Sequence, residues 1–225
     1  MNDPTALLEA TQAFVQAKHG SDSSGHDWWH VDRVRRMALR LAAAEGADPM
    51  TVELAALLHD IADWKFHDGN AEIGPEAARQ WLVSQQADAA LIQAVCEIVA
   101  GVTFKGAGVA TEMPTLEGKC VQDADRLDAI GAIGIGRAFA FGGAFGRAMY
   151  DPEISAQHHE DFTAYQKKSG PTLNHFPEKL FLLKDRLQTA TAHRIAEGRH
   201  RFLEEFYERF LAEWRGDDMA EFLEC

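Results

Sequence analysis

The residues best able to do chemistry lie in the stretch LAALLHDIADWKFHDG, which spans Leu54 to Gly69. A run of leucines and alanines ends in the pair His59 and Asp60, and Asp63 follows three residues later. An unpaired carboxylate at the end of such an apolar run is costly to bury, because the interior cannot solvate it as water does. A bound metal ion is the leading candidate for the group that compensates these charges.

Three further stretches carry polar residues of the same kinds. They are GHDWWHVDRV with His26, Asp27, His30 and Arg33, VTFKG with Lys105, and VQDADRLDAIG with Asp123, Asp125 and Asp128. Imidazole nitrogens and carboxylate oxygens without thiolates suit a divalent ion such as Mn, Fe, Co, Ni, Zn or Mg. With about four protein ligands, a six-coordinate ion keeps positions open for water or a phosphate oxygen, which favours catalysis over a structural role.

These residues resemble the HD-domain metal-dependent phosphohydrolases, whose pattern is a His, then a His-Asp pair, then a distant Asp. The matching motifs are H-x-x-R-V at His30, A-L-L-H-D-I at His59 and Asp60, and A-D-R-L at Asp125, in this order along the chain. The resemblance implies that these residues are the metal ligands.

The similarity extends over nearly the full chain. GHDWWHVDRV, VQDADRLDAIGAIGI, HFPEKLFLLKDRL and RHRFLEEFYERFLAEW look like a bacterial subgroup of small stand-alone HD hydrolases. Some members of that subgroup act as nucleoside triphosphate pyrophosphohydrolases. The segments least like the subgroup are residues 102–113 and 150–169.

The resemblance also suggests roles for carboxylates around the ion. By similarity to the nucleotidase branch of the family, Asp63 acts as general base or positions the attacking water. Its alternative role is to hold the ring of His59 or to pair with a lysine. Asp128 is a partner of a ligand or of a substrate hydroxyl, or it pairs with Arg126 or another neighbour and stabilises its helix.

Phosphate binding requires cationic side chains, because negative charge accumulates on the non-bridging oxygens during transfer. Lys105 is the strongest candidate, since glycines flank it and a flexible loop can approach a ligand. Arg33 is a further candidate, and the subgroup resemblance adds Lys179 and Lys184. Each of these could equally be a solvated surface charge. His26 could touch a phosphate or protonate the leaving group, or it could belong only to the start of the following helix.

Together these features predict hydrolysis of a phosphoanhydride or phosphoester, and the resemblance favours a (deoxy)nucleoside triphosphate cut to monophosphate and pyrophosphate. The expected cofactor is one divalent metal ion, with Mn first and Mg, Fe, Co, Ni or Zn as alternatives. The alternative functions are a 5′-nucleotidase, another phosphomonoesterase or phosphodiesterase of this fold, and a nucleotide sensor without turnover. Trp28, Trp29 and Trp64 could stack on a base, although core packing is the better account of at least two of them.

Apolar residues recur at helical spacing along most of the chain, and the alternation typical of strands is nearly absent. We therefore expect an all-α fold, a single HD-domain helical bundle over residues 1–225. Helices are expected over residues 3–18, 31–41, 52–63, 74–85, 88–100, 118–130 and 176–214, the last with a bend at Gly198. Residues 101–118 are expected to form a loop. Residues 138–174 are a candidate lid or insertion, or equally an excursion or oligomer contact, and residues 176–215 form the C-terminal helices.

Composition narrows the class of partner. The 225 residues carry a formal net charge of −13, which argues against nucleic acid, because a phosphate backbone would be repelled. The partner expected is a small phosphate compound, and the oligomeric state, including a homodimer, is left open. Because we find no long apolar run and no secretion signal, we expect a cytoplasmic protein without a membrane partner. The three cysteines suggest no disulfide framework, and two should fill the core.

Overall fold

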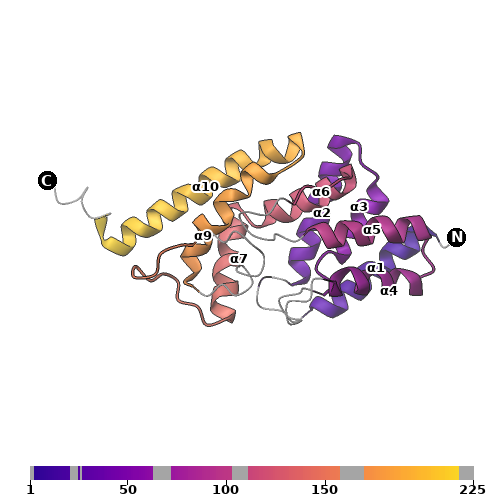
Figure 1. Ribbon diagram of the computed structural model, residues 1–225, viewed down its shortest axis with the longest axis horizontal. Coiled ribbons are helices and arrows are strands. Elements are labelled where there is room, and N and C mark those ends of the chain that lie inside the picture. The colour runs from indigo at the N-terminus through magenta and orange to yellow at the C-terminus, as the bar shows by residue number, and fades with distance from the viewer. Residues whose placement is uncertain are drawn as a thin grey trace.

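The protein is helical, without strands, throughout the part that the computed structural model describes: residues 3–20, 25, 27–62, 72–102, 111–157 and 170–217. Figure 1 shows an elongated arrangement in which the N-terminus and the end of α10 lie at opposite ends. The α-helices are α1 (Pro4–His19), α2 (Trp28–Glu45), α3 (Pro49–Leu58), α4 (Ile73–Ser84), α5 (Ala89–Val102), α6 (Leu116–Asp128), α7 (Gly131–Ala144), α9 (His175–Glu178) and α10 (Ala190–Arg215). Three 3-10 turns are η2 (Thr172–Asn174), η3 (Leu180–Leu182) and η4 (Lys184–Arg186). The predicted all-α fold class is confirmed.

Capping side chains explain where several helices begin. Asp27 accepts a hydrogen bond from the backbone N–H of His30 at 2.9 Å, and Asp48 accepts one from Thr51 at 2.8 Å. Each cap satisfies an N–H group that the first helical turn leaves without an internal partner. α2 ends at Glu45 and is capped by Gly46, whose φ of 87° is the left-handed conformation that glycine favours. These local signals set the bounds of α2 and the start of α3.

α3 lies at the centre of the N-terminal bundle, where it packs against α1, α2, α5 and α6. Residues 54–58 are all buried, so this part of the helix has no polar face. On α2 the predicted apolar stripe is buried, as Val31, Val34 and Leu41 show. A helix that is apolar all round belongs in the interior of a bundle. The bundle therefore holds the end of α3 in place from several sides.

Four other predicted helices occur as α1, α4, α5 and α6, with ends shifted by a few residues, as is usual for helix termini. The expected loop over residues 101–118 is shorter than predicted at both ends, because α5 includes Val102 and α6 begins at Leu116. Cys96 and Cys120 are buried and free, as expected for two of the cysteines. Within the described ranges no single helix is long and apolar enough to cross a membrane, and α6 and α7 reach that length only together, across a bend of 71°.

The prediction of a loop beginning at residue 138 was wrong, because residues 138–144 belong to α7. The glycines of this segment allow close packing. A Cβ at Gly134 would lie 2.2 Å from the carbonyl oxygen of Ala129, and one at Gly142 would lie 2.0 Å from Oγ1 of Thr172. α7 can therefore approach the end of α6 and η2 only with glycine at these positions. The lid remains a prediction for the rest of the segment, of which residues 158–169 lie outside the described part.

The C-terminal helical segment expected over residues 176–214 is interrupted, but not at the expected place, Gly198. Short turns occupy residues 172–186, and α10 begins only at Ala190. The break has a physical cause, because the backbone N–H groups of Gln188 and Thr189 bind the buried carboxylate of Asp123 on α6 at 2.8–3.0 Å. α10 then continues through Gly198 without a break.

Candidate metal centre

His30 lies in the first turn of α2, and its side chain points into the interior. The residue is fully buried, and its backbone N–H is the group capped by Asp27. Its ring nitrogen Nδ1 lies 2.8 Å from Oδ2 of Asp128 on α6. Because a carboxylate oxygen can only accept, Nδ1 carries the proton in this contact. The other ring nitrogen, Nε2, then presents a lone pair when the ring is neutral.

His59 and Asp60 lie at the end of α3. The helix ends at Leu58, His59 is its C-cap, and residues 59–62 form a turn, so the predicted continuous helix through Asp63 is wrong. His59 Nδ1 donates to the carbonyl oxygen of Ala56 at 2.8 Å, which again leaves Nε2 with a lone pair. The His59 residue is buried, whereas the side chain of Asp60 is 20% exposed.

Asp125 on α6 completes the cluster. From His30 Nε2 the distances are 3.2 Å to His59 Nε2, 3.3 Å to Asp60 Oδ2 and 3.6 Å to Asp125 Oδ1. From His59 Nε2 they are 3.6 Å to Asp60 Oδ2 and 4.0 Å to Asp125 Oδ1. The side chain of Asp125 is 30% exposed. Two imidazoles and two carboxylates, contributed by α2, the end of α3 and α6, therefore meet around one point.

These atoms fit a cation better than they fit one another. When both rings are neutral, two Nε2 lone pairs face each other at 3.2 Å, and two carboxylates face them as well. Acceptors gathered in this way require a positive centre between them. Nitrogen and oxygen donors of this kind suit a divalent transition metal or magnesium. The donor set therefore matches a divalent ion.

A second layer of charge lies behind His30. Arg33 donates to Asp128 through Nε at 2.8 Å and through a terminal nitrogen at 3.1 Å, and Arg137 from α7 approaches Oδ2 of Asp128 to 3.2 Å. Burial acts to raise the pKa of Asp128, but the hydrogen bonds from His30 and Arg33 and the charge of Arg137 hold it far below its usual range. Asp128 is therefore an ionised carboxylate that orients the His30 ring.

The same layer affects His30. Burial, the largest influence, and the charge of Arg137 act to lower its pKa, whereas the carboxylates of Asp128 and Asp60 raise it above the ordinary value. The effect of the carboxylates is the stronger, so this position attracts positive charge. A bound metal ion supplies that charge while both histidine ligands stay neutral.

Residues 28–130 match the HD domain family. The YpgQ protein of Bacillus subtilis (strain 168) is 38% identical over 211 residues, which cover 93% of this chain and 95% of that protein. An HD-superfamily hydrolase from Bacillus thuringiensis is 41% identical, with 95% and 99% of the two chains covered and a TM-score of 0.70. The chain belongs to the HD-domain family.

Other solved structures are similar to this chain over most of its length. A Lactobacillus plantarum protein is similar to this chain with a TM-score of 0.85 and 38% identity, covering 94% of this chain and 98% of its own. A crystal structure of YpgQ in complex with ADP has a TM-score of 0.68 and 33% identity, covering 92% and 96% of the two chains. The prediction of a metal-dependent phosphohydrolase of the HD superfamily is confirmed by the family match and the hydrolase relatives.

The residues predicted to bind substrate do not lie in one place in this HD protein. Arg33 and Asp128 bind each other behind His30, and Asp128 also binds the ring of His30. These contacts support a metal ligand and are not directed at a substrate. Lys179, between α9 and η3, and Lys184, the first residue of η4, are half-buried in the C-terminal turns. Their binding of phosphate stays a prediction. His26, Asp63 and Lys105 lie outside the described residues.

The sequence analysis missed Arg137. This side chain comes from α7, beyond the matched residues 28–130, and contacts Asp128 behind the cluster of His30, His59, Asp60 and Asp125, which we call the HD centre. Only 16% of the side chain is exposed. One signal was available, because a buried carboxylate such as Asp128 requires cationic partners. Nothing in the spacing, however, tells which of the arginines supplies them.

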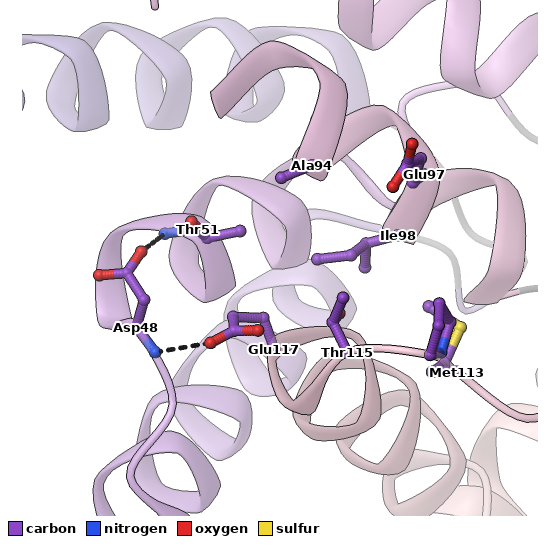
Figure 2. Close-up of a pocket in the computed structure, with 9 residues that line it drawn as sticks. Asp48, Thr51, Ala94, Glu97, Ile98, Met113, Thr115 and Glu117 are labelled. Carbon is purple, nitrogen blue, oxygen red and sulfur yellow. Dashed lines mark hydrogen bonds between the residues drawn. The ribbon is translucent and has the colours of Figure 1, made fainter. Parts of the chain in front are cut away.

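A pocket of about 220 Å³ lies elsewhere on the bundle and shares no residue with the HD centre. Its walls come from the start of α3, from α5, and from the segment that leads into α6, as Figure 2 shows. The lining residues are Asp48, Thr51, Ala94, Glu97, Ile98, Met113, Pro114, Thr115 and Glu117.

Proposed function

We propose that this protein hydrolyses a nucleoside or deoxynucleoside triphosphate to the monophosphate and pyrophosphate. The reaction uses one divalent ion, manganese in the first instance, held by His30, His59, Asp60 and Asp125. The observation that carries the proposal is the convergence of these four acceptor groups: His59 Nε2 and the carboxylates of Asp60 and Asp125 lie 3.2–3.6 Å from His30 Nε2. A divalent ion in such a site supplies Lewis-acid activation of water and of a phosphoryl oxygen.

The residues around the ion divide the work. The two imidazoles are buried and fixed through their Nδ1 atoms, which keeps both Nε2 atoms directed at the ion. The carboxylates of Asp60 and Asp125 are the partly exposed members, so a substrate reaches the ion from their side. Asp63 takes the proton of the attacking water. Lys105, Lys179 and Lys184 bind the phosphates that are not attacked.

Two observations support a nucleotide as substrate. The relative YpgQ has been crystallised in complex with ADP. In this chain Trp29, next to His30, is 61% exposed, whereas Trp28 is buried in the core. An exposed indole one residue from a metal ligand is a suitable surface for a base to stack on. Core packing therefore accounts for Trp28 but leaves Trp29 available.

The decisive test is a nucleotide panel with metal-free protein reloaded with Mn²⁺, in which pyrophosphate and orthophosphate are measured separately. Release of pyrophosphate from triphosphates supports the proposal. Orthophosphate from monophosphates would instead identify a nucleotidase, and tight nucleotide binding without any product would identify a sensor. The Asp63→Asn variant should keep its metal and lose at least about a hundredfold in kcat, as expected for a missing general base.

The role of Trp29 is tested by the Trp29→Ala variant. Loss of a stacking surface worth about 1–3 kcal/mol should raise KM for nucleotides about tenfold and leave metal content unchanged. Trp214, near the end of α10 and 48% exposed, gives a matched control, and its replacement by Ala should leave KM unchanged. An unchanged KM in Trp29→Ala would remove the indole from the substrate site.

A further inference from the structure

Arg137 is held at two points. Its Nε donates to the backbone carbonyl of Gly25 at 2.9 Å, and a terminal nitrogen lies 3.2 Å from Oδ2 of Asp128. Gly25 lies just before the cap of α2, and Asp128 is the last residue of α6. One guanidinium from α7 thus joins the chain that enters the His30 helix to the carboxylate that orients the His30 ring.

Close packing fixes α7 in the position from which Arg137 makes these contacts. Gly25 has a φ of +85°, and a Cβ built there would lie 3.5 Å from Cβ of Arg137, so this turn lies directly against the arginine. Gly134 lets α7 approach the backbone of Ala129. On the other side of the α6–α7 turn, Arg199 from α10 donates to the carbonyl of Leu127 at 2.5 Å. The position of Arg137 is therefore determined by the fold rather than by a flexible surface.

Both contacts of Arg137, with Gly25 and with Asp128, support the metal ligand His30. Oδ2 of Asp128 receives His30 Nδ1 at 2.8 Å, a terminal nitrogen of Arg33 at 3.1 Å and Arg137 at 3.2 Å. Arg33 belongs to the same helix as His30 and joins that helix to α6 through Asp128. Arg137 adds a link from a third element, α7, to the chain before α2 and to the same carboxylate. It anchors both the start of α2 and the partner of the imidazole.

We propose that Arg137 is a positioning residue of the metal centre. It holds Asp128, and through it the His30 ring, so that Nε2 faces the ion. The inference rests on the proposed metal-ligand role of His30 but not on the identity of the substrate. It makes α7, which lies outside residues 28–130, part of the support of the HD centre.

The test compares Arg137→Met with Arg35→Met in metal-free protein. Arg35 is a matched control, because it lies on α2 and is 21% exposed against 16% for Arg137, and it forms ion pairs with Asp32 and Glu53 away from the centre. Calorimetric titration with Mn²⁺ should give a dissociation constant raised about tenfold in Arg137→Met, the lower end of the effect of lost outer partners. Arg35→Met should stay within about twofold of the original protein, by the same standard.

A second measurement reads the ring directly. In ¹⁵N-labelled metal-free protein, at a pH at which the ring is neutral, His30 should show a protonated Nδ1 and an acceptor Nε2, and Arg137→Met should mix or broaden these signals. Arg137→Lys keeps the charge but cannot form both contacts, so its affinity should fall between the two, and it carries the test if the Met variant does not fold. Unchanged Mn²⁺ affinity and unchanged His30 signals, or equal weakening in Arg35→Met, would overturn the proposal. No nucleotide is used, so failure of the proposed hydrolysis would be seen separately.

Discussion

Two places where acidic side chains of the described residues gather are the HD centre and the pocket of Figure 2. In the pocket each carboxylate accepts from a nearby N–H group. Asp48 accepts from Thr51 at 2.8 Å, Glu117 from the backbone of Asp48 at 3.1 Å, and Glu97 from Gln93 at 2.6 Å. The first two contacts cap α3 and tie its start to α6, and the third lies within α5. They leave no set of acceptors directed at a common point.

In the HD centre the acceptors face one another instead. Among the described residues, His30, His59 and Asp60 are the group whose potential ligand atoms all lie within 4.8 Å of one another. Their proton-bearing nitrogens point outward, to Asp128 and to the carbonyl of Ala56. A metal site is therefore marked by acceptors that converge while their donors are engaged elsewhere, and not by the number of acidic residues.

The largest expected effect separates the two places directly. Asp60→Ala removes an acceptor from the convergent set and should weaken Mn²⁺ binding by more than the ~100-fold that loss of an outer partner can cost, with loss of activity. Glu117→Ala removes a carboxylate from the pocket and should leave both unchanged. Metal content by elemental analysis and Mn²⁺ titration measure the difference. Full metal occupancy in Asp60→Ala would refute the ligand assignment.

A smaller effect is expected one layer away from the ion. Asp128→Asn leaves His30 Nδ1 without its ionised partner, so the Mn²⁺ dissociation constant should rise about 10- to 100-fold. Asp123→Asn on the same helix is the control. The carboxylate of the buried Asp123 accepts hydrogen bonds from Gln188 and Thr189, which lie before α10. Its replacement should therefore change stability but not metal affinity. Equal metal affinities in the two variants would show that Asp128 does not support the ligand.

Local signals explain why much of the N-terminal bundle could be predicted. Helix caps such as Asp27 and Asp48 and the 3.6-residue apolar period act within a few residues of the chain. They are visible in the sequence whatever the helix packs against. The ordered His, His-Asp and Asp motifs are equally local, and the structure brings the four residues to within 4.0 Å of a neighbour.

The C-terminal part was harder, because contacts between distant segments decide it. The glycines of α7 suggest a loop in the sequence, but in the structure they allow close packing against Ala129 and Thr172. The start of α10 is set by Asp123, which lies on another helix and binds the backbone of Thr189. Arg137 was missed because one partner, Gly25, is 112 residues away, and the other, Asp128, is brought within reach only by the turn between α6 and α7. Such contacts form only in the assembled fold, so the hydrophobic periodicity of the sequence does not predict them.

The smallest expected effect lies in the pocket and concerns stability alone. Hydrogen bonds from the side chain and backbone of Thr51 lower the pKa of Asp48. The ionised carboxylate therefore stabilises the folded state above the unfolded pKa of about 3.9, and this contribution is lost as the pH falls through the lower folded value. Asp48→Ala should lower the free energy of unfolding by about 1 kcal/mol at pH 7, as for other helix caps, and by less below pH ~4.

Asp48→Asn isolates the charge from the cap. The amide oxygen can still accept from Thr51, so stability at neutral pH should stay close to that of the original protein, but its dependence on pH should be weaker. Urea unfolding of metal-free protein across this pH range measures both variants. A change in Mn²⁺ affinity in either one would contradict the separation of the two acidic regions, because Asp48 shares no contact with the convergent acceptors. Carboxylates that cap helices and carboxylates that hold a metal would then be energetically coupled through α3, whose two ends they occupy.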